Sequence, residues 1–161
     1  MIYFIDDFLP SYILDETIKD LSSQDYEELK TPGKSFYVQN ATQPFINHVT
    51  GMLSTIENKI IENILGFFRV SNENLDTDWR IHSDLNIQGQ KPDRALVLYI
   101  SPRKINELHG TALWEHKTYG KSLPNDVTNE EFDRMIIKES ENLDMWTLNS
   151  VIGYKQNRAI S

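Results

Sequence analysis

The sequence predicts an α+β fold whose helices pack on one side of a β-sandwich or barrel. Two observations predict it. Apolar residues recur at helical spacing in two segments before Gly66, and short apolar runs separated by turn residues dominate the rest of the chain. With 161 residues, of which 39% are hydrophobic, the chain is long enough to bury a core of its own. We therefore expect a single domain over residues 1–161.

The part of the chain before Gly66 is predicted to hold two strands and two helices. The strands are expected at Ile2–Ile5 and Ser35–Val38. Ser11 is a candidate N-cap for the first helix, whose apolar positions share one face and are Ile13, Leu14, Ile18 and Leu21. The second, longer helix is predicted over Gln43–Ile64 and is expected to end at Gly66.

Strands dominate the remainder of the chain. They are predicted at Phe67–Val70, Trp79–Asp84, Ala95–Ile100, Ala112–His116 and Trp146–Tyr154. Ala95–Ile100 is continuously apolar, which predicts a strand buried on both faces. Between the last two strands, Thr128 with Glu131 three residues later predicts a capping box and a short helix. That helix is expected to turn Met135 toward the core.

Composition excludes several classes of function. The 16 basic and 24 acidic residues give a formal net charge of −8, which disfavours general nucleic-acid binding. The absence of cysteine excludes disulfides, iron–sulfur clusters and thiol catalysis, so a metal would have to be held by His, Asp and Glu. The N-terminus lacks the basic region of a signal peptide, and no apolar run approaches the roughly 18 residues of a membrane span. We expect a cytoplasmic protein that does not engage membranes.

His82 and Asp84 are the strongest candidate site residues. Positions i and i+2 of a strand point to the same face, so this imidazole and this carboxylate would converge. Two histidines and one carboxylate form the facial triad of non-haem Fe(II) oxygenases, which leaves positions open for a cosubstrate and O2. Because a His-x-Asp tripeptide arises by chance about 0.3 times in such a chain, the prediction depends on its place at the end of a strand.

Five segments occur in an order that is similar to one known enzyme family. They are Tyr3–Pro10, Trp79–Asp84, Arg94–Ile100, Gly110–Lys117 and Trp146–Arg158. Together they resemble the compact prolyl-hydroxylase-like branch of the 2-oxoglutarate/Fe(II)-dependent oxygenases, over nearly the whole chain. Trp79–Asp84 resembles the strand that bears the first two iron ligands, and Gly110–Lys117 resembles the Gly-Thr-aromatic strand of those relatives.

The resemblance implies a double-stranded β-helix (a jelly-roll, cupin-like fold) with N-terminal helices packed on one face. It implies that His82 and Asp84 bind Fe(II), and that 2-oxoglutarate is converted to succinate and CO2 while a peptide side chain or a small molecule is hydroxylated. Tyr99 would donate its hydroxyl to a cosubstrate carboxylate. The alternative for Tyr99 is a core tyrosine bonded to the backbone. The resemblance assigns no catalytic acid or base.

One departure from the family pattern concerns the C-terminal end. The family has a distal histidine and a basic residue that binds 2-oxoglutarate, and both are expected beyond Arg158, where three residues remain. We therefore expect a truncated chain that lacks its C-terminal strands, has an empty metal site and is inactive alone. The alternative is a non-catalytic jelly-roll module with a binding or structural role. An unfinished sheet exposes unpaired backbone groups, so self-association through the C-terminal edge is expected.

Three further groups of residues are interpreted as structural. His116 lies on the same side of its predicted strand as Trp114, and we favour a packed or surface side chain over one that faces the site. Glu139-Ser140-Glu141 is spaced as a solvated helix end, and Arg158 matches a structural residue of the family.

Overall fold

The computed structural model describes residues 2–23, 25–31, 34–62, 64–72, 74–78, 80–82, 92–102, 109–122 and 127–161. These residues form a mixed α and β structure with small antiparallel sheets and three α-helices. The chain divides into two compact units, which we call the N-terminal unit (residues 5–79 and 100–102) and the C-terminal unit (residues 1–4, 80–99 and 103–161). The single domain over residues 1–161 stays a prediction.

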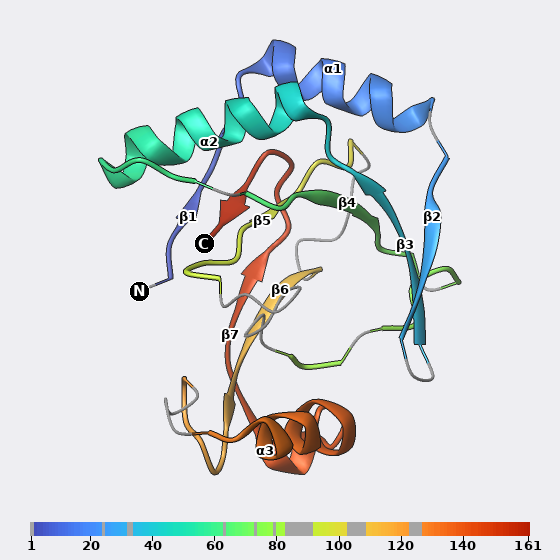
Figure 1. Ribbon diagram of the computed structural model, residues 1–161, viewed down its shortest axis with the longest axis vertical. Helices are drawn as coiled ribbons and strands as arrows, with labels where there is room; N and C mark the ends of the chain where they lie inside the picture. Colours follow the sequence, from blue (N-terminus) through green and yellow to red (C-terminus); the bar gives the residue numbers. More distant parts are fainter. Residues whose placement is uncertain are drawn as a thin grey trace. The chain divides into compact units, whose positions relative to one another are not determined.

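The N-terminal unit combines two helices with a three-stranded antiparallel sheet. Its elements are α1 (Ser11–Ser22), β2 (Glu27–Thr31), β3 (Lys34–Asn40), α2 (Gln43–Glu57) and β4 (Phe67–Val70). The strand order is β2-β3-β4, and Figure 1 shows both helices on the same side of this sheet. Val38 of β3 and Val49 of α2 are buried, and the rings of Phe45 and Phe68 lie 5.0 Å apart, so α2 packs on β4. These contacts bury Val49 and place Phe45 against β4, and both are apolar residues of the predicted helix.

The start of α1 and the end of α2 differ from the prediction. Pro10 occupies the N-cap position of α1, and Ser11 is its first helical residue, so the predicted Ser11 cap is wrong. α2 stops at Glu57 because Asn58 adopts a left-handed conformation (φ 51°), which an asparagine tolerates better than most residues. Ile60, an apolar residue inside the predicted helix, is 84% exposed. The predicted extension to Ile64 is therefore wrong.

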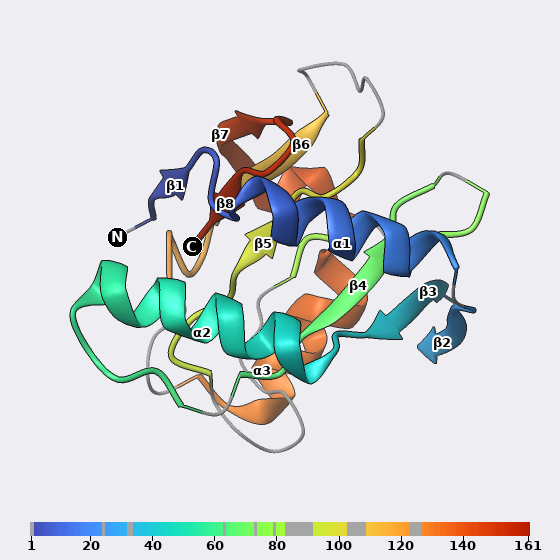
Figure 2. The ribbon, with the colours of Figure 1, turned by 90° about the horizontal axis from the view of Figure 1, so that it is seen from above.

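The C-terminal unit contains a second three-stranded sheet and a two-stranded one. β1 (Phe4–Ile5), β8 (Ala159–Ile160) and β5 (Val97–Leu98) form the first in the order β1-β8-β5, as Figure 2 shows. β8 is buried, and it pairs antiparallel with β5. β6 (Gly110–His116) and β7 (Trp146–Gly153) form the second sheet. The pairing of β1 with β8 thus brings residues near both ends of the sequence together.

The β6–β7 pair is the longest antiparallel ladder of this unit. Its register runs from Gly110 opposite Gly153 to His116 opposite Trp146, with a bulge that leaves Asn149 as the extra residue on β7. Gly110 is required by close approach, because a Cβ added there would overlap the carbonyl oxygen of Ile152. The sequence predicts both strands nearly to the residue.

Helical turns connect β6 to β7. They are α3 (Asn129–Arg134), a π-helical turn η1 (Met135–Glu139) and a 3-10 turn η2 (Leu143–Met145), and Figure 1 shows α3 beside the end of the hairpin. The predicted capping box at Thr128 and Glu131 is confirmed, and so is burial of Met135, which is 2% exposed. No helix formed by the described residues combines the length and the apolar character needed to cross a bilayer.

Two strand predictions in this unit are corrected. Residues 80–82 do not form a strand, and the rest of the predicted Trp79–Asp84 strand lies outside the described residues. β5 covers only Val97–Leu98, and Val97 is 42% exposed, so the predicted burial of Ala95–Ile100 on both faces is wrong. A short strand can show a continuous apolar run when only one of its faces is covered.

Candidate functional site

His82 belongs to the C-terminal unit and is one of the described residues 80–82, which have no regular secondary structure. Its side chain is exposed, and its Nδ1–H donates to the carbonyl oxygen of Arg80 at 2.8 Å. Because a carbonyl can only accept, this hydrogen bond places a proton on Nδ1. The neighbouring Ile81 N–H donates to the carbonyl of Ser140 at 3.2 Å, which ties the segment to the turn after η1.

Asp84, the second predicted ligand, lies outside the described residues. The expected convergence of His82 and Asp84 in one cavity therefore stays a prediction. Among the residues that the structure does describe, no three His, Asp or Glu side chains are grouped closely enough to hold a metal ion.

Tyr99 follows β5 and contacts Thr111 of β6 and Tyr154, the residue after β7. Its hydroxyl and that of Thr111 lie 2.6 Å apart, and its ring stacks on Tyr154 with the centroids 4.9 Å apart. The backbone of Tyr99 is fixed on both sides, since its N–H donates to Arg158 and its carbonyl accepts from Asn157. The hydroxyl is therefore held by a side chain, not by the backbone as the structural alternative supposed.

The contacts of Arg158 are structural. The guanidinium donates to the carbonyl of Gly153 at 2.8 Å and lies 4.9 Å from the centre of the Phe4 ring. This arrangement agrees with the interpretation of Arg158 as a structural residue.

The sequence did not single out Thr111 and Tyr154, which contact Tyr99. The Gly-Thr start of the predicted strand was the one signal that pointed to Thr111.

A buried polar cluster surrounds His116, at the end of β6. The side chain is 3% exposed, and its Nδ1 accepts from the backbone N–H groups of Thr118 (3.1 Å) and Tyr119 (3.3 Å). Nε2 therefore carries the proton and donates to the Glu139 carboxylate at 3.1 Å. The ring stacks on Tyr119 and meets Trp146 edge-on, with centroids 4.8 and 4.6 Å away. The prediction of a packed His116 is confirmed.

The solvated helix end predicted at Glu139-Ser140-Glu141 is wrong for its first two residues. The Glu139 side chain is only 18% exposed and pairs with His116, while Ser140 is 1% exposed. The π-helical turn rotates Glu139 inward relative to the α-helical phase that the spacing assumed. A signal for this pairing is absent from the local sequence, because His116 and Glu139 are distant along the chain.

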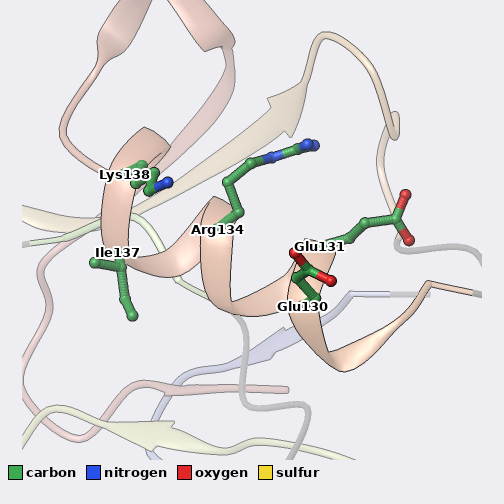
Figure 3. A pocket seen from close by; sticks show the side chains of 5 residues that line it. All are labelled: Glu130, Glu131, Arg134, Ile137 and Lys138. Carbon is green, nitrogen blue, oxygen red and sulfur yellow. The ribbon is translucent and has the colours of Figure 1, made fainter.

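A separate charged hollow of about 390 Å³ lies against α3 and η1. Five side chains line it, as Figure 3 shows, and they are Glu130, Glu131, Arg134, Ile137 and Lys138. Two of its charges are already engaged within the protein. Glu131 forms the capping box with Thr128, and Arg134 contacts both the Tyr119 hydroxyl at 3.0 Å and the Glu139 carboxylate at 3.4 Å. Two acidic and two basic side chains line the hollow, so it favours neither an anion nor a cation.

Acid is expected to weaken the capping box of α3. Hydrogen bonds from the Thr128 backbone N–H and hydroxyl, with a smaller attraction from Arg134, hold the pKa of Glu131 below its ordinary value. A carboxyl with a depressed folded-state pKa contributes stability above its unfolded-state pKa and loses it as the pH falls through the folded-state pKa. Urea midpoints between neutral pH and about pH 3 should fall less steeply for Glu131→Gln than for the wild type. The neighbouring Glu130→Gln is the control, and equal slopes in all three proteins would contradict the prediction.

Comparisons with models of known protein families, with curated proteins and with solved structures find no match for this chain.

Proposed function

We propose that the chain is a 2-oxoglutarate- and Fe(II)-dependent dioxygenase domain with a jelly-roll fold, and that its substrate is a peptide side chain or a small molecule. In this proposal His82 and Asp84 hold Fe(II), and Tyr99 contributes to binding 2-oxoglutarate.

The strand pairing of the C-terminal unit supports the jelly-roll part of the proposal. β6 pairs with β7, and β5, which precedes this hairpin, pairs with β8, which follows it. The pairs are nested along the chain and belong to two separate sheets. A jelly roll is built from Greek-key strands that wrap in this nested way into two sheets, so the topology favours it over a simple meander.

The observation that carries the metal-site proposal is the hydrogen bond that His82 donates from Nδ1 to the Arg80 carbonyl. Histidines that bind metals almost always donate their other ring N–H to a carboxylate or a backbone carbonyl, which fixes the ring and places the lone pair on the ligating nitrogen. The hydrogen bond from Nδ1 to Arg80 supplies this support, and in this proposal Nε2 would be the ligating atom. His82 therefore fits the group that the resemblance implies.

In this proposal His82 and Tyr99 each have a part in the chemistry. When bound, iron and 2-oxoglutarate supply activation of O2 for hydroxylation, with release of succinate and CO2. His82 provides one neutral nitrogen ligand whose orientation Arg80 fixes. The Tyr99 hydroxyl, by accepting a hydrogen bond from Thr111, can direct its own O–H to a cosubstrate carboxylate. The stack on Tyr154 keeps the Tyr99 ring in place for that contact.

The alternative function is a non-catalytic jelly-roll module with a binding or structural role. One observation favours it: the Tyr99–Thr111 hydroxyl pair and the Tyr154 stack also describe a self-contained core contact. Under this alternative the two hydroxyls satisfy each other and need no ligand.

Metal binding by the chain tests the proposal directly. Co(II) titrated into the wild type by calorimetry should show weak binding, which His82→Ala and Asp84→Ala should each weaken by at least about tenfold. His109→Ala is the matched control, since His109 is exposed and is not a predicted ligand. Binding that survives both ligand substitutions would refute the metal site.

A measurement of succinate formation distinguishes the proposed enzyme from the non-catalytic module. A chain extended through the expected distal histidine and basic residue should form succinate from 2-oxoglutarate only when Fe(II) is present, and His82→Ala in the same extended chain should abolish this. A folded extended chain that binds metal without forming succinate would favour the non-catalytic module.

Self-association through the C-terminal edge is also proposed, with a second copy as the partner. β8 lies in the middle of its sheet, so the relevant edge is that of β7, which in the described part of the chain pairs on one side only. β7 carries no charged residue, and natural edge strands commonly use charge to prevent pairing with another chain. Light scattering should show the mass rising with concentration, and Val151→Lys should hold the protein monomeric. A wild type that stays monomeric at high concentration would contradict this.

A further inference from the structure

The imidazole of His116 closes the tight turn that follows β6. The backbone N–H and carbonyl of His116 exchange hydrogen bonds with Gly120, at 3.0 and 2.7 Å, and Gly120 has a positive φ of 79°, which glycine adopts without strain. Inside this loop the Nδ1 of His116 accepts from the backbone N–H groups of Thr118 (3.1 Å) and Tyr119 (3.3 Å). One ring nitrogen therefore holds two backbone donors of the turn in place.

The other ring nitrogen of His116 faces η1. Its Nε2–H donates to the Glu139 carboxylate at 3.1 Å, and the ring meets Trp146 of β7 edge-on. Tyr119 stacks on the ring, and its hydroxyl accepts from Arg134 of α3, which also lies 3.4 Å from the Glu139 carboxylate. Among the described residues, the titratable and charged groups that these contacts bring to the buried ring are Glu139, Tyr119 and Arg134.

A proton added to this ring has to go to Nδ1, because Nε2 already carries one. The charged ring would then present an N–H to two backbone N–H groups, so both hydrogen bonds to the turn would be lost. The bond from Nε2–H to Glu139 would become charge-assisted on both sides and strengthen. The same carboxylate supplies the counter-charge that a buried imidazolium needs. Protonation of His116 therefore breaks its contact with the turn and strengthens its contact with η1.

We propose that His116 is a pH-sensitive latch on the turn formed by residues 117–120. The neutral ring holds the turn closed, and the protonated ring stays paired with Glu139 and releases the two backbone N–H groups. A released turn also draws Tyr119 away from its stack on His116 and from the guanidinium of Arg134, so the end of β6 loses a tie to α3. This latch uses neither iron nor 2-oxoglutarate and is independent of the proposed function.

NMR of the full chain across about pH 8 to 5.5, where histidines change charge, measures both sides of the latch. Long-range ¹H–¹⁵N spectra report the protonation of the His116 nitrogens, and amide hydrogen exchange, expressed as protection relative to an unstructured chain, reports the turn. As Nδ1 gains its proton, the protection of the Thr118 and Tyr119 amides should fall by at least about tenfold. The amides of the β6–β7 ladder should keep their protection.

His116→Asn is the matched control. The carbonyl oxygen of asparagine lies about where Nδ1 does, can accept from the same two N–H groups and does not titrate. The turn of this variant should stay protected over the whole pH range. Loss of the same protection in His116→Asn as the pH falls would overturn the latch, because another titrating group would then be responsible.

Glu139→Gln covers the case in which His116→Asn does not fold. The amide keeps an oxygen for Nε2–H but removes the counter-charge, so protonation of His116 and loss of turn protection should move together to lower pH. The latch is wrong if the two transitions separate or if neither moves. Three results on the wild type also overturn it: a ring that stays neutral down to about pH 5.5, a turn whose protection stays constant while the ring gains its proton, and an equal loss of protection throughout the β6–β7 ladder.

Discussion

Gly110→Ala is expected to destabilise the protein by about 3 kcal/mol or more, because the new Cβ would overlap a backbone atom of the paired strand. The atom concerned is the carbonyl oxygen of Ile152, and the carbonyl carbon of Gly153 lies 3.1 Å from the same Cβ position. A backbone atom in a β-ladder cannot rotate away as a side chain can. For a chain of this size the melting temperature should fall by about 6–12 °C.

The effect should extend to the candidate site. Thr111, which contacts the Tyr99 hydroxyl, is the next residue on β6, so a displaced start of β6 also moves this hydroxyl pair. The aromatic near-ultraviolet circular dichroism of Gly110→Ala should report the loss of the Tyr99–Tyr154 stack. Both changes are measured on one sample, by thermal unfolding and by circular dichroism.

Gly51→Ala is the matched control for this substitution. A Cβ at Gly51 in α2 meets nothing within 4 Å, so alanine should raise stability by about 0.5–1 kcal/mol through its better helix propensity. If Gly110→Ala left the melting temperature unchanged or raised it, the close approach of β6 to β7 would be wrong.

Asp76→Ala is expected to lower the free energy of unfolding by about 2–3 kcal/mol. Its carboxylate accepts two hydrogen bonds from Arg69, at 2.7 and 2.6 Å, and one from the Asp78 N–H at 3.0 Å. The two side chains are only 11% and 27% exposed, so removing the carboxylate leaves a partly buried guanidinium over the Phe36 ring without its counter-charge. Urea unfolding monitored by fluorescence measures the loss.

An exposed ion pair in the same unit provides the comparison. Lys30 and Glu28 lie 3.3 Å apart with side chains 75% and 35% exposed, so Lys30→Ala should cost no more than about 0.5 kcal/mol. Raising the salt concentration should remove that small cost while leaving the effect of Asp76→Ala largely intact, because buried charges are screened less. Equal losses for the two substitutions would show that burial of the Arg69–Asp76 pair contributes nothing.

Sequence patterns predicted those parts of the fold that depend on residues close together in the chain. The capping box at Thr128 and Glu131 is a contact across three residues, and it is present. β4 and the β6–β7 strands are bounded by turn residues and have the predicted extents to within a few residues. The predicted end of α2 was wrong. The apolar spacing continues past Asn58, but the left-handed conformation of Asn58 stops the helix.

The remainder of the fold depends on contacts that local patterns do not contain. β8 has two residues and is a strand only because β1 and β5 flank it, and β2, with its charged sequence, is a strand because β3 pairs with it. In the candidate site, His82 could be selected from the His-x-Asp pattern. The Glu139 partner of His116 could not, because a π-helical turn set its direction.

The position of β8 has a consequence for the order of folding. Tyr3 and Ser161 exchange two backbone hydrogen bonds, of 2.9 and 3.0 Å, so nearly the full length of the chain is closed into a loop by the sheet β1-β8-β5. Closing so long a loop costs entropy that is repaid only after the contact forms, which makes such pairings slow. On the ribosome, β1 is synthesised well before β8, the strand with which it pairs in the described part of the chain. The β2-β3-β4 sheet, whose pairings are local, can form well before that moment.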